Sequence, residues 1–171
     1  GCTDFNSGVA VSDSLFGSLR QAWSSDKISS FGSIICFNCE VDEESAAFIH
    51  ERFVEIVIAP SFSSRALEVL TLKKNVRLIK LSSEDLDTTE PQIRSISGGW
   101  LVQSEDIAQE SELEVVTESK KIATSVDLIR FGITVTKFLK SNAISLVSIS
   151  DGAFVLAGAG MGNPNRVVSI D

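Results

Sequence analysis

The chain has few cysteines, one histidine, no surplus of positive charge and no long apolar run, and each shortage excludes a class of protein. No apolar stretch approaches the roughly 20 residues that a membrane-spanning helix needs. A basic segment followed by an apolar stretch is missing at the N-terminus, so we expect no signal peptide. The net charge of −8 argues against a binder of nucleic acid or of anionic membranes, because both need clustered Lys and Arg.

The three cysteines are Cys2, Cys36 and Cys39. A small, odd number predicts a reducing, cytoplasmic location rather than a disulfide framework. Cys36 and Cys39 have a Cys-x-x-Cys spacing, but a zinc site needs further ligands and, in deaminase folds, a His-x-Glu segment that the chain lacks. We therefore expect no metal and interpret both as buried structural cysteines. His50, the only histidine, lies in an acidic predicted helix, where we expect it at the surface.

The pattern of apolar residues predicts one globular domain over the 171 residues. Helical spacing of apolar side chains predicts helices over 13–24, 42–53, 63–73 and 124–139. Short apolar runs predict strands over 32–37, 54–59 and 76–81. This alternation favours a layered α/β domain with a mostly parallel sheet.

Two stretches between these segments are harder to assign from the pattern. Residues 93–103 read as a strand interrupted by Gly98 and Gly99, where another backbone could approach closely. The charged stretch 104–120 is interpreted as solvated, with a short strand at Glu114–Thr117.

Asn142 lies where the last predicted helix meets a buried strand. An amide side chain at such a junction can both donate and accept hydrogen bonds in a cleft. A tight turn at Asp151-Gly152 and a second strand follow, and Gly158–Gly162 is predicted to be a glycine-rich loop whose amides approach a ligand closely. Arg166 can then pair with a phosphate through two N–H groups.

Five segments occur in the order and at the spacing of one known family: Ser29–Gly32, Phe53–Pro60, Leu72–Leu78, Ser97–Gln103 and Lys140–Ile144. They resemble the formyltransferase domain of the bifunctional purine biosynthesis family, AICAR transformylase, which is usually fused to IMP cyclohydrolase. The resemblance, from about Gly8 to the C-terminus, implies a three-layer α/β/α, cytidine-deaminase-like subdomain. The family domain has two such subdomains. Residues 1–171 are similar to the first, so we interpret them as a single partial domain without the second, folate-contacting one.

The resemblance also implies a reaction and its residues. In this family a formyl group passes from the co-substrate 10-formyltetrahydrofolate to AICAR, without a metal. Phe31, Gly32 and Glu55 match positions that line the nucleotide pocket. Asn142 matches the asparagine that holds the substrate near the reacting amine, which makes it the candidate catalytic residue, and Arg166 matches an arginine of the same pocket. We therefore expect Gly32, Glu55 and Asn142 around one hollow.

The residues by themselves also allow plainer interpretations. Phe31-Gly32 can be a tight turn before a buried strand, and Glu55 can be a solvated carboxylate at a strand edge. Asn142 can end a helix in the left-handed conformation.

The sequence departs from the family pattern at two places. Aligning Gly8–Ala10 with the end of the family's Lys-His-x-Asn-Pro-Cys-Gly-Val-Ala segment places Cys2 and Thr3 under Lys and His. The family histidine acts as general base or proton shuttle, and neither Cys nor Thr can replace it at neutral pH. In the same segment, Phe5 and Asn6 replace Asn and Pro.

The second departure is in the glycine-rich segment. Met161 and Asn165 replace the family's Gln and Ser, and two extra residues precede Arg166.

Two classes of function stay open. In the first, the chain is part of an AICAR formyltransferase, inactive alone, and the Lys-His pair and folate site come from another segment or chain. In the second, it is a non-catalytic nucleotide-binding or interaction module derived from the family. Either way the expected partners are an AICAR-like nucleotide and a second copy of the chain or a complementary transformylase/cyclohydrolase segment, with no nucleic acid and no membrane.

Overall fold

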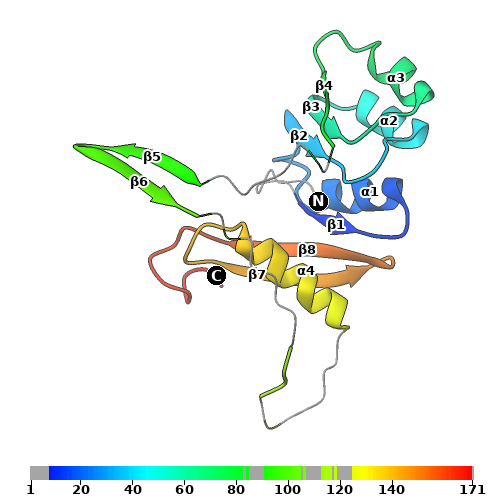
Figure 1. Ribbon diagram of the computed structural model, residues 1–171. Coiled ribbons are helices and arrows are strands. Elements are labelled where there is room, and N and C mark those ends of the chain that lie inside the picture. Colours follow the sequence, from blue (N-terminus) through cyan, green and yellow to red (C-terminus); the bar gives the residue numbers. More distant parts are fainter. Residues whose placement is uncertain are drawn as a thin grey trace.

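The computed structural model describes residues 8–82, 84, 91–104, 106, 113–116, 118 and 125–170. The strands among them form two three-stranded sheets, β1-β8-β7 and β2-β3-β4, and one hairpin, β5-β6 (Figure 1). The first departure from the family pattern, at Cys2-Thr3 and Phe5-Asn6, lies outside the described residues.

The sheet β2-β3-β4 is parallel, as the alternation of apolar segments predicts. Its strands are β2 (Ser33–Cys36), β3 (Val54–Ala59) and β4 (Arg77–Lys80), and the connections contain α2 (Glu43–His50) and α3 (Ser64–Leu70). We call residues 31–80 the parallel unit. These elements fall within the predicted segments and confirm the α/β class.

The parallel unit surrounds a closed apolar core. Seven of its side chains are fully buried: Val41, Ala46, Ile49, Val57, Ala59, Ala66 and Leu70. The buried faces of α2 and α3 pack together over β3, whose Val57 and Ala59 alternate with more exposed residues. Because each buried Val, Leu or Ile contributes roughly 1.5–3 kcal/mol, this core is the main source of stability in the unit.

Side-chain oxygens start all four described helices. Each accepts a hydrogen bond from the backbone N–H three residues ahead, and the four residues are Ser14, Asp42, Ser63 and Ser125. A lysine from another segment binds the C-terminal end of α2: the Lys73 ammonium donates to the carbonyl oxygens of Ile49 and Arg52. Desolvation at this position lowers the pKa of Lys73.

The sheet β1-β8-β7 is antiparallel, so the parallel arrangement is limited to the sheet β2-β3-β4. β1 (Ala10–Val11) pairs with β8 (Ala153–Gly160), which pairs with β7 (Ile144–Ser150). We call these strands and α4 (Val126–Lys137) the antiparallel unit. The predicted turn at Asp151-Gly152 joins β7 to β8, and both residues have positive φ, 49° and 76°.

Helices cover both faces of this antiparallel sheet. Phe154 and Leu156 of β8 belong to the apolar cluster under α4. Side chains alternate along a strand, so Ala153 and Val155 face the other way. Helix α1 (Leu15–Ser25) contacts β8 and lies across the sheet from α4 (Figure 1). Leu19 of α1 is also part of the parallel unit's core, so α1 is shared by the two units.

The stretch predicted as one interrupted strand is a hairpin instead. β5 (Gln92–Ile96) and β6 (Gly99–Gln103) pair through a turn at Ser97-Gly98, because Gly98 adopts a positive φ of 86° that reverses the chain. The hairpin projects from the body, and Trp100 on it is 70% exposed (Figure 1). The strand predicted at Glu114–Thr117 is also wrong: residues 114–116 have no regular structure, and Thr117 lies outside the described residues.

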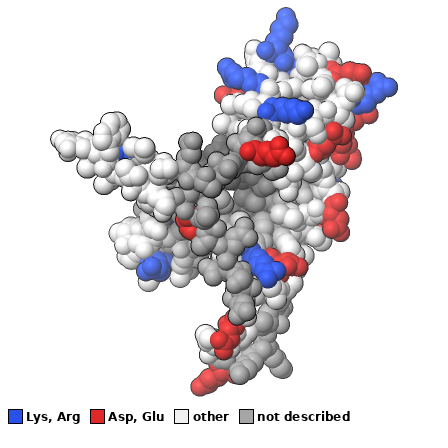
Figure 2. Space-filling view, in the orientation of Figure 1, with Lys and Arg blue, Asp and Glu red and all other residues white. Residues whose placement is uncertain are grey.

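Charged side chains of both signs share the visible surface. Figure 2 shows Lys and Arg interspersed with Asp and Glu over the part of the molecule that contains α2 and α3. Among the described residues, no helix combines the length and apolarity required to cross a bilayer.

Candidate functional site

Three of the predicted site residues lie together where β2 and β3 begin. Phe31 and Gly32 directly precede β2, and Glu55 is the second residue of β3. The two strands are parallel neighbours, so their amino ends meet at one edge of the sheet. The Gly32 N–H donates to the Phe53 carbonyl oxygen at 3.0 Å, which fixes the two strand starts against each other.

Gly32 has a positive φ of 76°, a conformation that side chains rarely adopt. A Cβ placed there would lie 3.4 Å from Cε1 of the Phe53 ring and 3.8 Å from Oε1 of Glu55. The lack of a side chain at Gly32 therefore lets the Phe53 ring and the Glu55 carboxylate lie close to its backbone.

A hydrogen-bonded turn holds the segment that leads to Phe31. The Asp26 carboxylate accepts from the backbone N–H groups of Ile28 and Ser29, each at 3.0 Å. The Ser30 hydroxyl, which is fully buried, donates to the Asp26 carbonyl oxygen at 2.6 Å. The Ser29 hydroxyl and then the Ser29 N–H lower the pKa of Asp26, so this carboxylate is ionised in the turn.

Glu55 lies near the start of its strand, a setting that suits a carboxylate among apolar residues because such a group is costly to bury unpaired. Its side chain is exposed, next to Gly32. An exposed carboxylate can accept hydrogen bonds from amine or amide N–H groups of a ligand. Both interpretations, a solvated strand edge and a ligand contact, are compatible with this position.

Asn142 lies between α4 and β7, at the predicted helix-to-strand junction. Its Nδ2 donates to the carbonyl oxygens of Asn163 and Pro164, at 3.1 and 3.2 Å. Its own carbonyl oxygen accepts from the Ser169 hydroxyl at 3.1 Å. The amide donors of Asn142 are therefore engaged with the C-terminal segment, 161–170, and the side-chain oxygen makes no hydrogen bond within the described part of the chain.

Most of the predicted glycine-rich loop, Gly158–Gly162, is strand instead, which corrects the sequence interpretation. Gly158 and Gly160 belong to β8 and pair with Leu146 and Ile144 of β7. Gly160 is needed for packing, because a Cβ there would lie 1.9 Å from the Ser169 carbonyl oxygen. The chain leaves the sheet only at Met161, and Arg166 lies exposed in the segment that folds back.

The structure therefore divides the predicted site residues into two groups. Phe31, Gly32 and Glu55 lie together in the parallel unit, and Asn142 lies with the Arg166 segment beside the antiparallel sheet. No hydrogen bond, ion pair or ring contact between described residues joins the groups. The expectation that Gly32, Glu55 and Asn142 surround one hollow stays a prediction.

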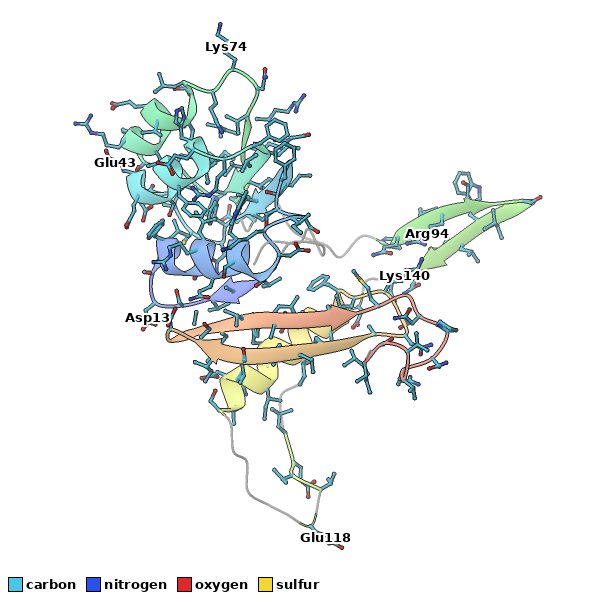
Figure 3. All side chains as sticks on the ribbon, turned by 180° about the vertical axis from the view of Figure 1, so that it is seen from behind. Asp13, Glu43, Lys74, Arg94, Glu118 and Lys140 are labelled. Carbon is cyan, nitrogen blue, oxygen red and sulfur yellow. The ribbon has the colours of Figure 1, made fainter. Side chains whose placement is uncertain are left out.

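Two hollows formed by described residues lie elsewhere. One of about 390 Å³ lies between the start of α1 and the β7–β8 turn, and is lined by Asp13, Arg20 and Asp151 among others. One of about 180 Å³ lies between α1 and the segment 36–39 at the carboxyl end of β2. Figure 3 shows Asp13 and Lys140 toward opposite ends of the antiparallel sheet, so the first hollow is remote from Asn142.

Sequence reasoning missed the ring of Phe53, which packs on Phe31. Their ring centroids are 4.8 Å apart with an interplanar angle of 33°. The available signal was an aromatic residue directly before an apolar strand, much as Phe31 precedes β2 with one glycine between.

The cysteines and the histidine differ from expectation. Cys36, the last residue of β2, is half-buried, but Cys39 is exposed in the following loop, so the prediction of a buried Cys39 is wrong. His50 ends α2 and is half-buried rather than at the surface, and its buried Nδ1 makes no hydrogen bond to the residues that the structure describes. Across the described ranges, no three His, Cys, Asp or Glu side chains are arranged to hold a metal ion.

Comparison with known proteins gives consistent matches over most of the chain. The family model described as AICARFT/IMPCHase bienzyme matches residues 5–171. The bifunctional purine biosynthesis protein PurH of Anoxybacillus flavithermus is 43% identical over 162 residues, which is 94% of this chain and 31% of that protein. PurH of Fusobacterium nucleatum subsp. nucleatum is 44% identical over 137 residues, 80% of this chain and 27% of that protein. The chain thus spans about three tenths of the length of these curated relatives.

Proposed function

Because the chain belongs to the AICARFT/IMPCHase bienzyme family, we propose that it forms part of the nucleotide pocket of an AICAR formyltransferase in purine (IMP) biosynthesis. The observation that carries the proposal is the grouping of Phe31, Gly32 and Glu55 where β2 and β3 begin. An exposed aromatic ring, a close backbone and a carboxylate suit a flat heteroaromatic base with amine and amide groups.

The reaction we propose for the complete site is formyl transfer from 10-formyltetrahydrofolate to AICAR. The amine nitrogen of AICAR bonds to the formyl carbon, the bond from that carbon to the folate nitrogen breaks, and the amine proton ends on the folate. In this site the Phe31 ring stacks on the base, and Glu55 accepts hydrogen bonds from its N–H groups. Asn142 orients the ligand and Arg166 pairs with the phosphate.

We propose that the chain alone does not complete this reaction. The positions aligned with the family's Lys-His pair are Cys2 and Thr3, which cannot shuttle the proton at neutral pH. The pair and the folate site would come from a second copy of the chain or a complementary segment, in a cytoplasmic setting. A non-catalytic nucleotide-binding module is the second candidate, and the same two residues favour it.

Calorimetric titration of the full chain with AICAR tests the pocket. We expect binding that Glu55→Ala weakens about tenfold or more, because a hydrogen bond to a charged group contributes roughly 1.5–3 kcal/mol. Glu68→Ala, which removes an exposed carboxylate of α3, is the matched control and should leave affinity unchanged. Absence of binding by the unaltered chain would exclude the proposed pocket and leave a scaffold role.

A formyl-transfer assay tests whether the chain needs a complementary segment. With AICAR and 10-formyltetrahydrofolate, we expect the isolated chain to give no turnover above the uncatalysed background. Turnover above background would refute the proposal that the chain needs a complementary segment.

A further inference from the structure

The stacked rings of Phe31 and Phe53 form an exposed aromatic pair that the packing of the core does not explain. Phe31 is 73% exposed and Phe53 45% exposed. Neither is among the side chains packed against the core around Ile49 and Leu70. Two large rings held in water at one strand edge leave an apolar surface that a ligand can cover.

The backbone fixes how these rings meet. Phe53 directly precedes β3 and accepts, through its carbonyl oxygen, the hydrogen bond from Gly32. Its ring lies against Gly32, where a Cβ would be 3.4 and 3.6 Å from Cε1 and Cδ1. A side chain at position 32 would therefore compete with the ring for this place, and the glycine lets Phe53 lie beside Phe31.

We propose that Phe53 is a positioning residue for the base of the bound nucleotide. Its ring supports one side of the Phe31 ring, at 4.8 Å between centroids, so that the open face of Phe31 is held ready to stack on a planar heteroaromatic ring. Glu55, beside Gly32, then accepts hydrogen bonds from N–H groups on the edge of that base. This inference rests on the proposed function and adds how the pocket recognises the base rather than the sugar phosphate.

The contribution of Phe53 follows from the cost of ordering a side chain. An unsupported, exposed phenylalanine samples several rotamers, and stacking a base on it would require fixing one of them. Aromatic pairs of this separation contribute roughly 0.5–1.5 kcal/mol beyond the area they bury, which corresponds to about two- to tenfold in affinity.

The test compares two ligands on the full chain by calorimetry: AICAR, and ribose 5-phosphate, which shares the sugar phosphate but lacks the base. Phe53→Leu should weaken AICAR binding about five- to tenfold and leave ribose 5-phosphate binding unchanged. Phe53→Tyr keeps the ring and should bind AICAR within about twofold of the unaltered chain. Leu72→Ala, at a residue equally exposed at 73%, is the control and should change neither affinity.

Different outcomes separate this inference from the proposed function. If the chain binds AICAR, and Phe31→Ala weakens binding but Phe53→Leu does not, the role of Phe53 is refuted and the pocket stands. Equal weakening for both ligands would also refute it, since that indicates a general loss of structure. If the unaltered chain does not bind AICAR, both proposals fail. Thermal unfolding checks that Phe53→Leu folds; if it does not, Phe53→Met, which is flexible and lacks a ring, takes its place with the same expected loss.

Discussion

The parallel and antiparallel units bury their apolar side chains to different degrees, and each carries one group of the predicted site residues. In the parallel unit, side chains from α2, α3 and β3 are fully enclosed. In the antiparallel unit, the buried members of the α4 cluster keep 5–9% of their surface exposed. The parallel unit presents an open aromatic and acidic surface on a closed core, whereas the antiparallel unit engages Asn142 in holding its own C-terminal segment.

This difference suggests that matching family motifs need not have matching roles. The side chains of Phe31 and Glu55 are exposed to solvent, and the backbone of Gly32 already forms its hydrogen bond within the protein. Asn142 directs its amide donors toward backbone carbonyls. A ligand at Asn142 would use the remaining side-chain oxygen or displace part of segment 161–170.

The largest expected effect is on the closed core. Ile49→Ala should lower the free energy of unfolding by roughly 2–5 kcal/mol, because Ile49 is fully buried and the cavity cannot be filled. Ile149→Ala, in β7, removes the same atoms from a side chain that is 56% exposed, and should cost less than about 1 kcal/mol. Urea denaturation of both variants measures the difference. Similar losses would mean that the two units are equally well packed.

A smaller effect is expected where segment 161–170 meets β8. Gly160→Ala places a Cβ 1.9 Å from a backbone oxygen that cannot simply rotate away, so the segment must move, at a cost of roughly 1–3 kcal/mol. Gly158→Ala meets only the Leu146 side chain, at 3.9 Å, and is the matched control.

Hydrogen exchange of the Ser169 and Ile170 amides reports this movement, since both amides donate to backbone carbonyls within the segment. Exchange should accelerate in Gly160→Ala and stay unchanged in Gly158→Ala. Unchanged exchange in both variants would show that the segment is not held by this contact.

The smallest effect concerns the turn that leads to Phe31. The pKa of Asp26 is lowered below its ordinary 3.8, so its contribution to stability is present above that pH and is lost as pH falls through the folded-state pKa. Ser29→Ala removes the largest cause and should raise the pKa of Asp26 toward 3.8 in an NMR titration. Ser25→Ala removes a hydroxyl that bonds Gln21 instead, and should leave the titration as it was.

Much of the parallel unit could be predicted, because its elements carry local signals. Val54–Ala59 is a run of apolar residues apart from Glu55, and Pro60 ends it. Asp42 caps α2 directly before the acidic residues of its first turn. The turn at Asp151-Gly152 is equally local.

The errors arise where a glycine's reason is distant in sequence. The sequence pattern indicates a loop at Gly160, yet this residue lies in β8 and pairs with Ile144, and it must be a glycine because the backbone of Ser169 packs on it. At Gly98 the reason is instead local: the pattern indicates an interruption of one strand, yet the positive φ of this residue makes the turn of a hairpin. For the candidate site, the sequence pattern located Phe31 and Glu55 next to strand starts, but only the pairing of β2 with β3 brings the ring of Phe53 onto that of Phe31.

The pairing of β1 with β8 has a consequence for synthesis of the chain. Ala10 is paired with Val155 and Val11 with Phe154, whereas β2, β3 and β4 are complete by Lys80. A nascent chain emerges N-terminus first, so the parallel sheet can assemble while the antiparallel one still lacks its central strand. Until β8 leaves the ribosome, the backbone groups of Ala10 and Val11 have no strand to pair with and are hydrogen-bonded to water.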